Sequence, residues 1–374
     1  MSQTFDSVAK YIYEHKNWTD FTWQEKSINV VFGEVRLMQG KIIGQMNALG
    51  FSAKEEATLT ALTLDIVKSS EIEGELLNFE QVRSSIARKL GINTAGLVKS
   101  SRHLDGVVSM MLDATQRFEL PLTEKRIFGW HAALFPTGFS GLYKIEVGQY
   151  RTGEMQIVSG AIGKEKIHYE AVKPEFVKPE MDKFLDWFNN DNSLDLVIKA
   201  AIAHFWFIII HPFDDGNGRI GRALTDMLLA RAEGSGERFY SMSSQILEER
   251  KKYYEVLQKV QHSSNDITEW LSWFLHCLKN AMSATENTMQ KIMLKAEFWK
   301  LHEATAINER QRKILNILFD NFEGKLQTSK WAKINKISTE TALRDIKDLI
   351  DKRILRQTNE GGRNANYELV NFKI

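Results

Sequence analysis

The sequence predicts a mostly α-helical protein of more than one domain, with a small β-hairpin inside it. The chain has 374 residues, which is more than one domain usually holds. Only five residues are proline, which favours long helices over loop-rich β architecture. Apolar residues recur at helical spacing along most of the chain, and a glycine-rich stretch at residues 137–170 interrupts them.

The composition is that of an ordinary globular protein, with 43% hydrophobic and 26% charged residues. A net charge of +1 argues against a chain built wholly to coat nucleic acid or an anionic membrane. The single cysteine, Cys277, excludes an intrachain disulfide and favours a reducing compartment. No secretory signal is visible, and the longest apolar run, near residues 200–210, is shorter than the ~20 residues of a membrane span. We therefore expect a soluble cytoplasmic protein.

Helices are expected in two groups on either side of the glycine-rich stretch. The first group covers residues 24–49, 54–69, 101–118 and 123–134, the last with Thr123 as N-cap. The second group covers residues 179–189, 194–210 and most of 218–300. Between the groups, Met155–Val158 and Lys166–Tyr169 are predicted to pair as a β-hairpin.

The last segment, residues 305–374, has the order of helices and strands expected for a winged helix-turn-helix. Helices are expected at 309–322, at 328–335 and after Ser338, and strands at 354–357 and 365–370. From Ile307 onward there are 14 Lys/Arg and nine Asp/Glu residues. This excess of basic over acidic residues is compatible with DNA binding through Ser338–Leu349. Further basic side chains would contribute, namely Lys330, Lys333, Lys336, Arg344 and Arg363. Three acidic side chains on the same helix would repel phosphate, which favours a protein-interaction module instead: Asp345, Asp348 and Asp351.

Residues 211–222, His-Pro-Phe-Asp-Asp-Gly-Asn-Gly-Arg-Ile-Gly-Arg, carry the strongest functional signal. A buried helix should end at Ile210, because Pro212 disfavours the helical conformation at His211. A glycine turn then leads into a second helix, whose free N–H groups attract anions. Arg219 and Arg222 lie three residues apart on one face of that helix and suit a polyphosphate.

The same string supplies two further groups for phosphoryl or nucleotidyl transfer. Asp215 would be repelled by phosphate unless a cation lies between them, so Mg²⁺ is expected there. His211 has a pKa suited to proton abstraction near neutral pH. The triplet Gly216-x-Gly218-x-x-Gly221 also matches a dinucleotide fingerprint, but its flanks read as helices instead of a strand and a helix. No Gly-Lys-Ser/Thr of a Walker loop is present in this stretch.

The string resembles, at every specified position, the signature of Fic-domain proteins, His-Pro-Phe-x-Asp/Glu-Gly-Asn-Gly-Arg-x-x-Arg. The resemblance implies a protein adenylyltransferase of the Fic/DOC family, which moves AMP from ATP to a target hydroxyl. His211 would be the general base and Asp215 would hold Mg²⁺. The remaining motif residues would bind the phosphates, namely Gly216, Asn217 and Gly218 as an anion hole and Arg219 and Arg222 on the β- and γ-phosphates.

Two other segments fit the same family. Gly148–Arg151 resembles the entry to its target-binding flap, expected at about residues 153–170, and Tyr254 would contact adenine. Ser69-Ser70-Glu71-Ile72-Glu73-Gly74 resembles its inhibitory pattern Ser/Thr-x-x-x-Glu-Gly/Asn. Ser69 and Glu73 lie four apart on one helical face, and the resemblance implies that Glu73 pairs with Arg222 in place of the γ-phosphate.

Three simpler interpretations stand beside these. His204, two helical turns before His211, is expected to be a core residue, because no third ligand follows at zinc-like spacing. Cys277 lies in an apolar helix and should be an inert buried thiol. Asp214 is the variable position of the motif, and a capping or solvated role is expected for it.

The expected organisation is an N-terminal helical region at 1–100 with its inhibitory helix at about 54–74, a Fic core at 101–290 and the winged helix at 305–374. ATP and a target protein with a Ser, Thr or Tyr hydroxyl, possibly the chain itself, would be its partners, with a homodimer as a further expectation. Two alternatives stay open. One is a DNA-binding regulator whose Fic core senses nucleotide. The other is a Fic enzyme that uses another nucleotide donor or removes AMP.

Overall fold

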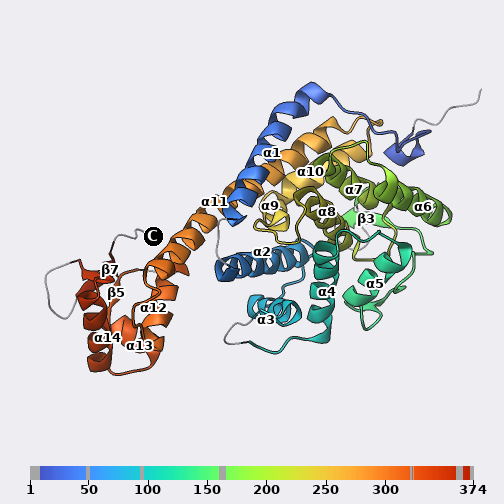
Figure 1. Cartoon of the computed structure of the whole chain (residues 1–374). Helices are drawn as coiled ribbons and strands as arrows, with labels where there is room; N and C mark the ends of the chain where they lie inside the picture. The colour runs from blue at the N-terminus through green and yellow to red at the C-terminus, as the bar shows by residue number, and fades with distance from the viewer. Residues whose placement is uncertain are drawn as a thin grey trace, which may run out of the picture. The chain divides into compact units, whose positions relative to one another are not determined.

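Figure 1 shows the computed structural model, which describes residues 9–47, 51–92, 97–159, 166–320, 322, 324–358 and 365–370. The chain divides into two compact units, Met1–Asn47 with Glu55–Thr285 and Ala48–Lys54 with Glu286–Ile374. The segments expected at 1–100 and 101–290 therefore lie in one unit, apart from a few residues around 50 and the last few before 290. Among the described residues, no helix is long and apolar enough to cross a membrane.

Helices dominate both units, and strands are short. The elements that begin before residue 200 are η1 (Ile12–Glu14), α1 (Glu25–Asn47), α2 (Phe51–Ile72), α3 (Phe79–Leu90), α4 (Arg102–Gln116), α5 (Glu124–Leu134), β1 (Phe139–Ser140), β2 (Tyr143–Lys144), β3 (Gln156–Ser159), β4 (Lys166–Glu170), α6 (Pro174–Asn190) and α7 (Leu196–Ile210). The later elements are α8 (Asn217–Glu233), α9 (Met242–Glu248), α10 (Arg250–Gln261), α11 (Thr268–Leu301), α12 (Glu309–Asp320), β5 (Leu326–Gln327), α13 (Thr328–Asn335), α14 (Thr339–Asp351), β6 (Leu355–Gln357) and β7 (Asn366–Leu369).

The mostly helical fold class is confirmed, and the predicted helices agree with α1, α2 and α4–α8 to within a few residues. Thr123 is the N-cap of α5, as expected, since its side chain accepts from the backbone N–H of Arg126. Helix α3 was not predicted. Its buried face holds only two larger apolar residues, Val82 and Ile86, beside Ser84, Ser85 and Ala87, so few apolar residues mark this helix in the sequence.

The centre of the first unit is α7, whose side chains are buried on every side. It packs along α8 and α6. Within α7, His204 accepts from the Tyr253 hydroxyl at Nε2 (3.0 Å) and donates from Nδ1 to the Thr225 hydroxyl (2.9 Å). Burial lowers the pKa of His204 to about 3, so the ring is neutral. His204 is thus a hydrogen-bonded core residue, in agreement with the simpler interpretation.

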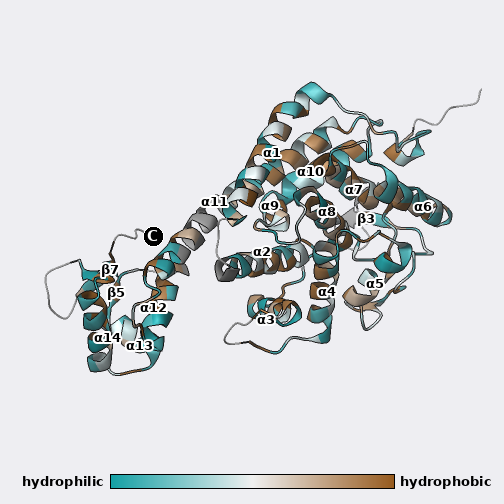
Figure 2. Ribbon diagram, viewed as in Figure 1, coloured by the Kyte–Doolittle hydropathy of each residue, from teal (hydrophilic) through white to brown (hydrophobic). Residues whose placement is uncertain are grey.

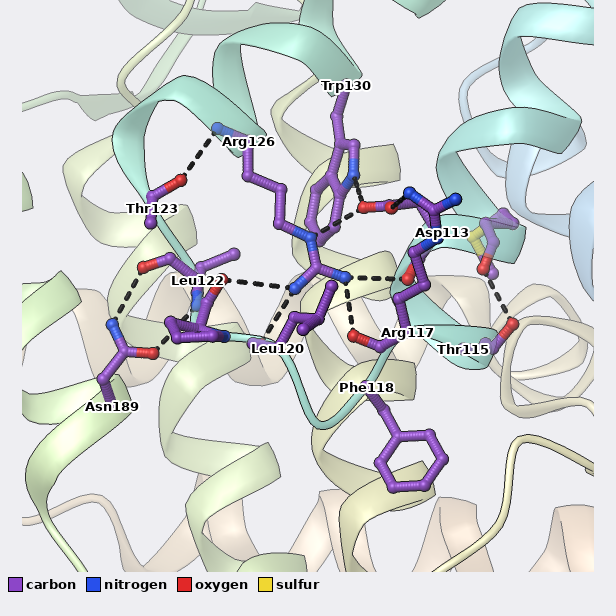
Figure 3. A network of polar contacts seen from close by, with 12 residues as sticks. Asp113, Thr115, Arg117, Phe118, Leu120, Leu122, Thr123, Arg126, Trp130 and Asn189 are labelled. Atoms are coloured by element: carbon purple, nitrogen blue, oxygen red, sulfur yellow. Dashed lines mark hydrogen bonds and ion pairs between the residues drawn. The ribbon is translucent and has the colours of Figure 1, made fainter.

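The loop that joins α4 to α5 is held by side chains of α5, α6 and α8, and Figure 3 shows the contacts made by Arg126 and Asn189. Arg126 donates to the Asp113 carboxylate and to the backbone carbonyls of Asp113, Arg117, Leu120 and Pro121. Asn189 of α6 pairs with both backbone groups of Leu122. Arg231 of α8 donates to the Phe118 carbonyl at 2.7 Å. These bonds fix the end of α8 against α4, α5 and α6.

A buried polar cluster joins α2 to α8. The Asp65 carboxylate accepts from the Ser241 hydroxyl at 2.7 Å and from the Ser243 backbone N–H at 3.0 Å. Asp226 of α8 binds the guanidinium of Arg238, which is 3% exposed. Burial raises the pKa of Asp226 well above its usual range, whereas Asp65 keeps a lowered pKa because its hydrogen bonds and Arg238 outweigh its burial. A single proton shared by Asp65 and Asp226 leaves this pair with one negative charge. That charge balances the positive charge of Arg238.

Apart from residues of α2 and α11, the second unit contains the helices α12, α13 and α14 and an antiparallel sheet of order β5-β7-β6. Helices α12 and α14 are amphipathic, with teal and brown sides in Figure 2, and their apolar sides enclose a core around Ile314, Trp331 and Ile346. Asp345 is buried and forms two 2.8 Å bonds with Arg310, while Asp348 binds Gln311 and Lys352. The expectation of an outward-facing carboxylate is therefore wrong for Asp345, because α12 covers that side of α14. The Asp348 side chain remains 44% exposed. The expected turn at 359–363 lies outside the described residues.

We expect Arg238→Met to lower the free energy of unfolding by about 3–5 kcal/mol, because it leaves the buried carboxyl pair without its cation. Asp226→Asn is the matched control, since an amide has the shape of a protonated carboxyl group and leaves Asp65 balanced by Arg238. That variant should lose less than about 1.5 kcal/mol. Urea denaturation followed by circular dichroism measures both variants. Equal losses would contradict the shared proton.

Candidate active site

The site begins where α7 ends. His211 caps this helix in the left-handed conformation, with φ 51° and ψ 60°, and its backbone N–H donates to the Phe207 carbonyl at 3.0 Å. The expected end of the helix at Ile210 is confirmed, and His211 leaves the right-handed helical conformation, as expected, for the left-handed one. A left-handed conformation costs energy for a residue other than glycine, and it persists only where neighbouring contacts impose it.

The His211 ring is oriented by its own helix. Nδ1 lies 3.3 Å from the Ile208 carbonyl, which can only accept, so Nδ1 carries the proton and Nε2 keeps a free lone pair. Burial lowers the pKa of His211 to about 4. The ring is therefore neutral at pH 7, with an unprotonated nitrogen available to take a proton.

Arg151 imposes the turn at His211. Its side chain is 2% exposed and donates from Nε to the His211 carbonyl at 2.8 Å, from Nη1 to the Gly153 carbonyl at 2.8 Å and from Nη2 to the Val172 carbonyl. Its backbone N–H donates to the Pro212 carbonyl at 2.9 Å. A cation at the C-terminal end of α7 is favourable because the helix dipole is negative there. Sequence reasoning placed Arg151 at the flap entry but missed this role.

Asn217 and Gly216 shape the loop after His211. The Asn217 side chain accepts from the Phe213 N–H (3.0 Å) and donates to the Phe213 carbonyl (2.7 Å), which closes the loop on itself. Gly216 has φ +83°, and a Cβ there would approach the Phe135 ring at 2.9 Å. Both the conformation and the space thus require glycine at 216. The backbone N–H groups of the first turn of α8 follow directly.

Asp215 is held by two residues that sequence reasoning did not identify. The Ser140 hydroxyl donates to its carboxylate, and His131 lies 3.2 Å from its backbone carbonyl. The other ring nitrogen of His131 accepts from the Gly148 N–H at 3.1 Å, and burial lowers the pKa of His131 to about 4. A neutral histidine therefore connects the flap entry to the motif loop. No local sequence signal marks His131 for this role.

The two arginines of the motif lie on the first turns of α8 and meet carboxylates from the end of α2. Arg222 is 2% exposed and binds the Ser69 hydroxyl from Nε, and the Ser69 carbonyl and Glu73 from Nη2, at 2.8, 2.8 and 2.7 Å. Arg219 binds Glu75 at 2.8 Å. The structure therefore brings Ser69 and Glu73 to Arg222, and adds a contact between Arg219 and Glu75 that was not anticipated.

Glu73 also covers the start of α8. A Cβ on Gly218 would stand 2.0 Å from Glu73 Oε1 and 3.2 Å from Arg222 Nη1, so a larger residue at 218 would displace this carboxylate. The position next to free helix N–H groups favours an anion. The carboxylate of Glu73 thus occupies the place that the sequence assigns to phosphate.

Tyr254 lies on α10 and is 43% exposed. The Arg250 guanidinium stands 5.7 Å from the centre of its ring, and the neighbouring Tyr253 belongs to the buried chain through His204. Negative Glu73 and positive Arg222 both act on the hydroxyl of Tyr254, which places this ring near the arginine pair. An exposed aromatic face at that position is available for stacking.

The flap strands β3 and β4 pair antiparallel from Gln156–Glu170 to Ser159–Lys166, with an irregularity after Ile157. The hairpin prediction is confirmed for these strands, while the turn expected at 160–163 lies outside the described residues. Tyr169 of β4 donates from its hydroxyl to the Ile209 carbonyl at 2.7 Å. The base of the flap is therefore anchored to the end of α7, one turn from His211.

Comparison with known families gives two matches. Residues 121–229, which include the whole motif, match the Fic/DOC family, and residues 11–92 match a domain of unknown function (DUF4172). The second match covers α1, α2 and α3, and so includes Ser69 and Glu73. It carries no functional description.

Relatives and solved structures agree with the first match. Protein adenylyltransferase Fic of Drosophila willistoni is 27% identical over 248 residues, 64% of this chain and 46% of its own length. Protein adenylyltransferase fic-1 of Caenorhabditis elegans is 33% identical over 90 residues, 24% of this chain and 16% of its own. The chain thus matches less than half the length of these relatives.

Two crystal structures share the fold. A Fic family protein from Desulfovibrio desulfuricans superposes with a TM-score of 0.56 at 20% identity, over 95% of this chain and 98% of its own. A Fic domain containing signaling protein from Bacteroides thetaiotaomicron gives 0.50 at 21% identity, over 71% and 98%. With the motif, the family match and this fold in agreement, the chain carries a Fic/DOC family domain.

Proposed function

We propose that this chain is an autoinhibited protein adenylyltransferase that transfers AMP from ATP to a hydroxyl side chain of a target protein. The observation that carries the proposal is the neutral His211 ring, with Nε2 unprotonated, beside an α8 start where Arg219 and Arg222 converge. The names of the relatives support it. Because those relatives are longer than the part that matches, activity, substrates and partners remain proposals for this chain.

In this reaction His211 Nε2 takes the proton of the target hydroxyl. The hydroxyl oxygen attacks the α-phosphorus of ATP, the bond to the β-phosphate oxygen breaks and pyrophosphate leaves. The backbone N–H groups at Gly216, Asn217 and Gly218 and the two arginines stabilise the negative charge. Such catalysis is mainly positioning and charge stabilisation, and a base of this kind contributes roughly 100- to 10,000-fold.

Asp215 is the residue that would hold Mg²⁺. In the described residues no cluster of three or more His, Cys, Asp or Glu side chains is present. A single carboxylate fits Mg²⁺, which is usually bound by one or two carboxylates together with substrate phosphates and water. The Asp215 side chain is 41% exposed and 4.0 Å from Arg219, so it borders the phosphate region. When bound, the ion would neutralise phosphate charge.

The flap would align an extended target segment by adding it as a strand to the β3–β4 hairpin, so that main-chain hydrogen bonds fix the position of the hydroxyl. Tyr254 would contact the adenine. Inhibition would come from Glu73, which holds the arginine that the γ-phosphate needs. A cytoplasmic location and a homodimer are further parts of this proposal, and light scattering coupled to size exclusion tests the dimer.

We expect Glu73→Gly to raise AMP incorporation by about tenfold or more, because it frees Arg222 and uncovers Gly218. His211→Ala in the Glu73→Gly background should lower incorporation at least about 100-fold. Radiolabelled ATP with purified protein, alone and with added cell extract, measures both. If the Glu73→Gly protein takes up no label from ATP, CTP, GTP or UTP, the transferase proposal fails. Label from another nucleotide would favour a different donor, and release of AMP from a modified protein would favour the reverse reaction.

Asp215→Asn in the Glu73→Gly background should raise the Mg²⁺ concentration for half-maximal incorporation, because an amide binds Mg²⁺ more weakly than a carboxylate. Asp214→Asn is the matched control. The Asp214 carboxylate accepts from the Glu146 N–H at 2.9 Å, a bond that an amide oxygen can keep. A magnesium titration of incorporation separates the two variants, and equal shifts would remove Asp215 from the metal site.

DNA binding by the second unit is a second candidate, which the burial of Asp345 now favours. We propose that residues 305–374 form a winged helix. The solvent-exposed side of α14 carries Arg344 and Lys347, with Lys333 and Lys336 exposed just before it, and the exposed acids are Glu340, Asp351 and the 44% exposed Asp348. The repulsion expected from Asp345 is removed, because its carboxylate is buried and paired with Arg310, and the charge of Asp348 is paired with Lys352.

If this unit binds DNA, Arg344→Ala with Lys347→Ala should weaken binding and lower the slope of log affinity against log salt by about two. Lys251→Ala with Lys252→Ala, on the exposed side of α10, removes the same charge elsewhere and should leave that slope unchanged. Gel-shift titrations of duplex DNA at several salt concentrations measure it. The absence of binding by the parent protein would leave a protein-interaction role for the unit.

A further inference from the structure

A second carboxylate holds the other arginine of the motif. Glu75 Oε2 accepts from Arg219 Nη1 at 2.8 Å, while Glu75 Oε1 lies 2.5 Å from His103 Nε2. The Arg219 side chain is only 6% exposed and that of Glu75 is 32% exposed, so this contact is partly shielded from water. A shielded bond between charged groups is stronger than the usual surface ion pair.

The end of α2 explains how two neighbouring acids reach two different arginines. Gly74 adopts φ +85°, and the N–H groups of Gly74 and Glu75 donate to the carbonyls of Glu71 and Ser70. This is the Schellman ending of a helix, which reverses the chain at the glycine. Glu73 stands before the reversal and Glu75 after it. The two carboxylates are thereby directed to Arg222 and Arg219, three residues apart on α8.

His103 of α4 keeps Glu75 in place and ionised. Its hydrogen bond is the largest influence on Glu75 and lowers the pKa of the carboxyl group, with Arg219 acting in the same direction and Asp215 against it. In return, Glu75 raises the pKa of His103. Glu75 therefore lies between His103 and Arg219, so that α4, α8 and the segment just after α2 meet at this carboxylate.

The arginines also keep unused donors. In the part of the chain that the structure describes, Arg219 Nε and Arg222 Nη1 are buried without a hydrogen-bond partner. Nη1 of Arg222 lies beside Gly218. Buried donors are rarely left unpaired, and an anion with more oxygens than one carboxylate would satisfy them. The two carboxylates thus fill the arginine pair incompletely.

We propose that Glu75 is a second inhibitory carboxylate, which occupies Arg219 as Glu73 occupies Arg222, so that full nucleotide binding requires both to leave. This inference rests on the proposed function, because it concerns the same site. Loss of Glu73 alone frees one arginine and leaves the other neutralised by Glu75. Glu75 and His103 therefore set how far the Glu73→Gly variant can be activated.

Titration of MgATP by calorimetry tests this without requiring catalysis. In the Glu73→Gly background, Glu75→Gln should tighten ATP binding by about tenfold, and His103→Ala should act in the same direction with a smaller effect. Glu71→Gln is the matched control. Glu71 lies two residues before Glu73, as Glu75 lies two residues after it, and pairs with Lys68 at 2.7 Å. It should leave the affinity within about twofold of the parent.

Two results would overturn the inference. Unchanged affinity in the folded Glu73→Gly/Glu75→Gln protein would show that Glu75 does not compete with nucleotide. Weaker binding would show that Glu75 positions Arg219 for nucleotide instead of withholding it. A thermal melt near that of the parent confirms folding, and the His103→Ala variant gives a second measurement. Tighter ATP binding without AMP transfer would support the inhibitory role of Glu75 and reject the transferase proposal, so the two failures are distinguishable.

Discussion

The buried guanidinium of Arg222 is the constraint on which the rest of the site depends. An arginine removed from water costs several kcal/mol unless its charge and its N–H groups are met. Here the hydroxyl and backbone carbonyl of Ser69 and the carboxylate of Glu73 accept three hydrogen bonds from Arg222, and Glu73 also supplies the opposite charge. In the folded chain, Ser69 and Glu73 thus pair with Arg222 in the way that a bound polyphosphate would. Folding and nucleotide binding compete for one cation, and that competition is the physical basis of the proposed inhibition.

A second buried arginine couples the turn at His211 to the base of the flap. Arg151 binds the carbonyl of His211 on one side and that of Val172, just after β4, on the other. The turn that presents the His211 ring and the base of the flap are therefore one rigid assembly. A hydroxyl held by the flap would meet a base whose position relative to it is set by the same guanidinium.

The sequence was most informative where the signal is local. The helix end at Ile210, the glycine turn and the paired arginines follow from twelve consecutive residues, and α13 was predicted at its exact bounds by the turns around it. Contacts across the fold were harder. The Glu73–Arg222 pair came only from the family resemblance, since 149 residues separate its members. The sequence did not reveal the roles of Arg151, His131 and Glu75, because their partners are far away in the chain and the adjacent residues do not indicate them. The exposure of Asp345 was predicted wrongly, because helical periodicity does not show which side of α14 is covered by α12.

The cluster around Asp65 has a consequence for how inhibition can end. Asp65 precedes Ser69 by one helical turn and is fixed to Ser241, Ser243 and the carboxyl group of Asp226. Helix α2 is therefore pinned immediately before the segment that touches Arg222. Release need not dislodge the helix as a whole: fraying of its final turn, from Ser69 through Gly74, withdraws both acids while the pinned part keeps the core intact.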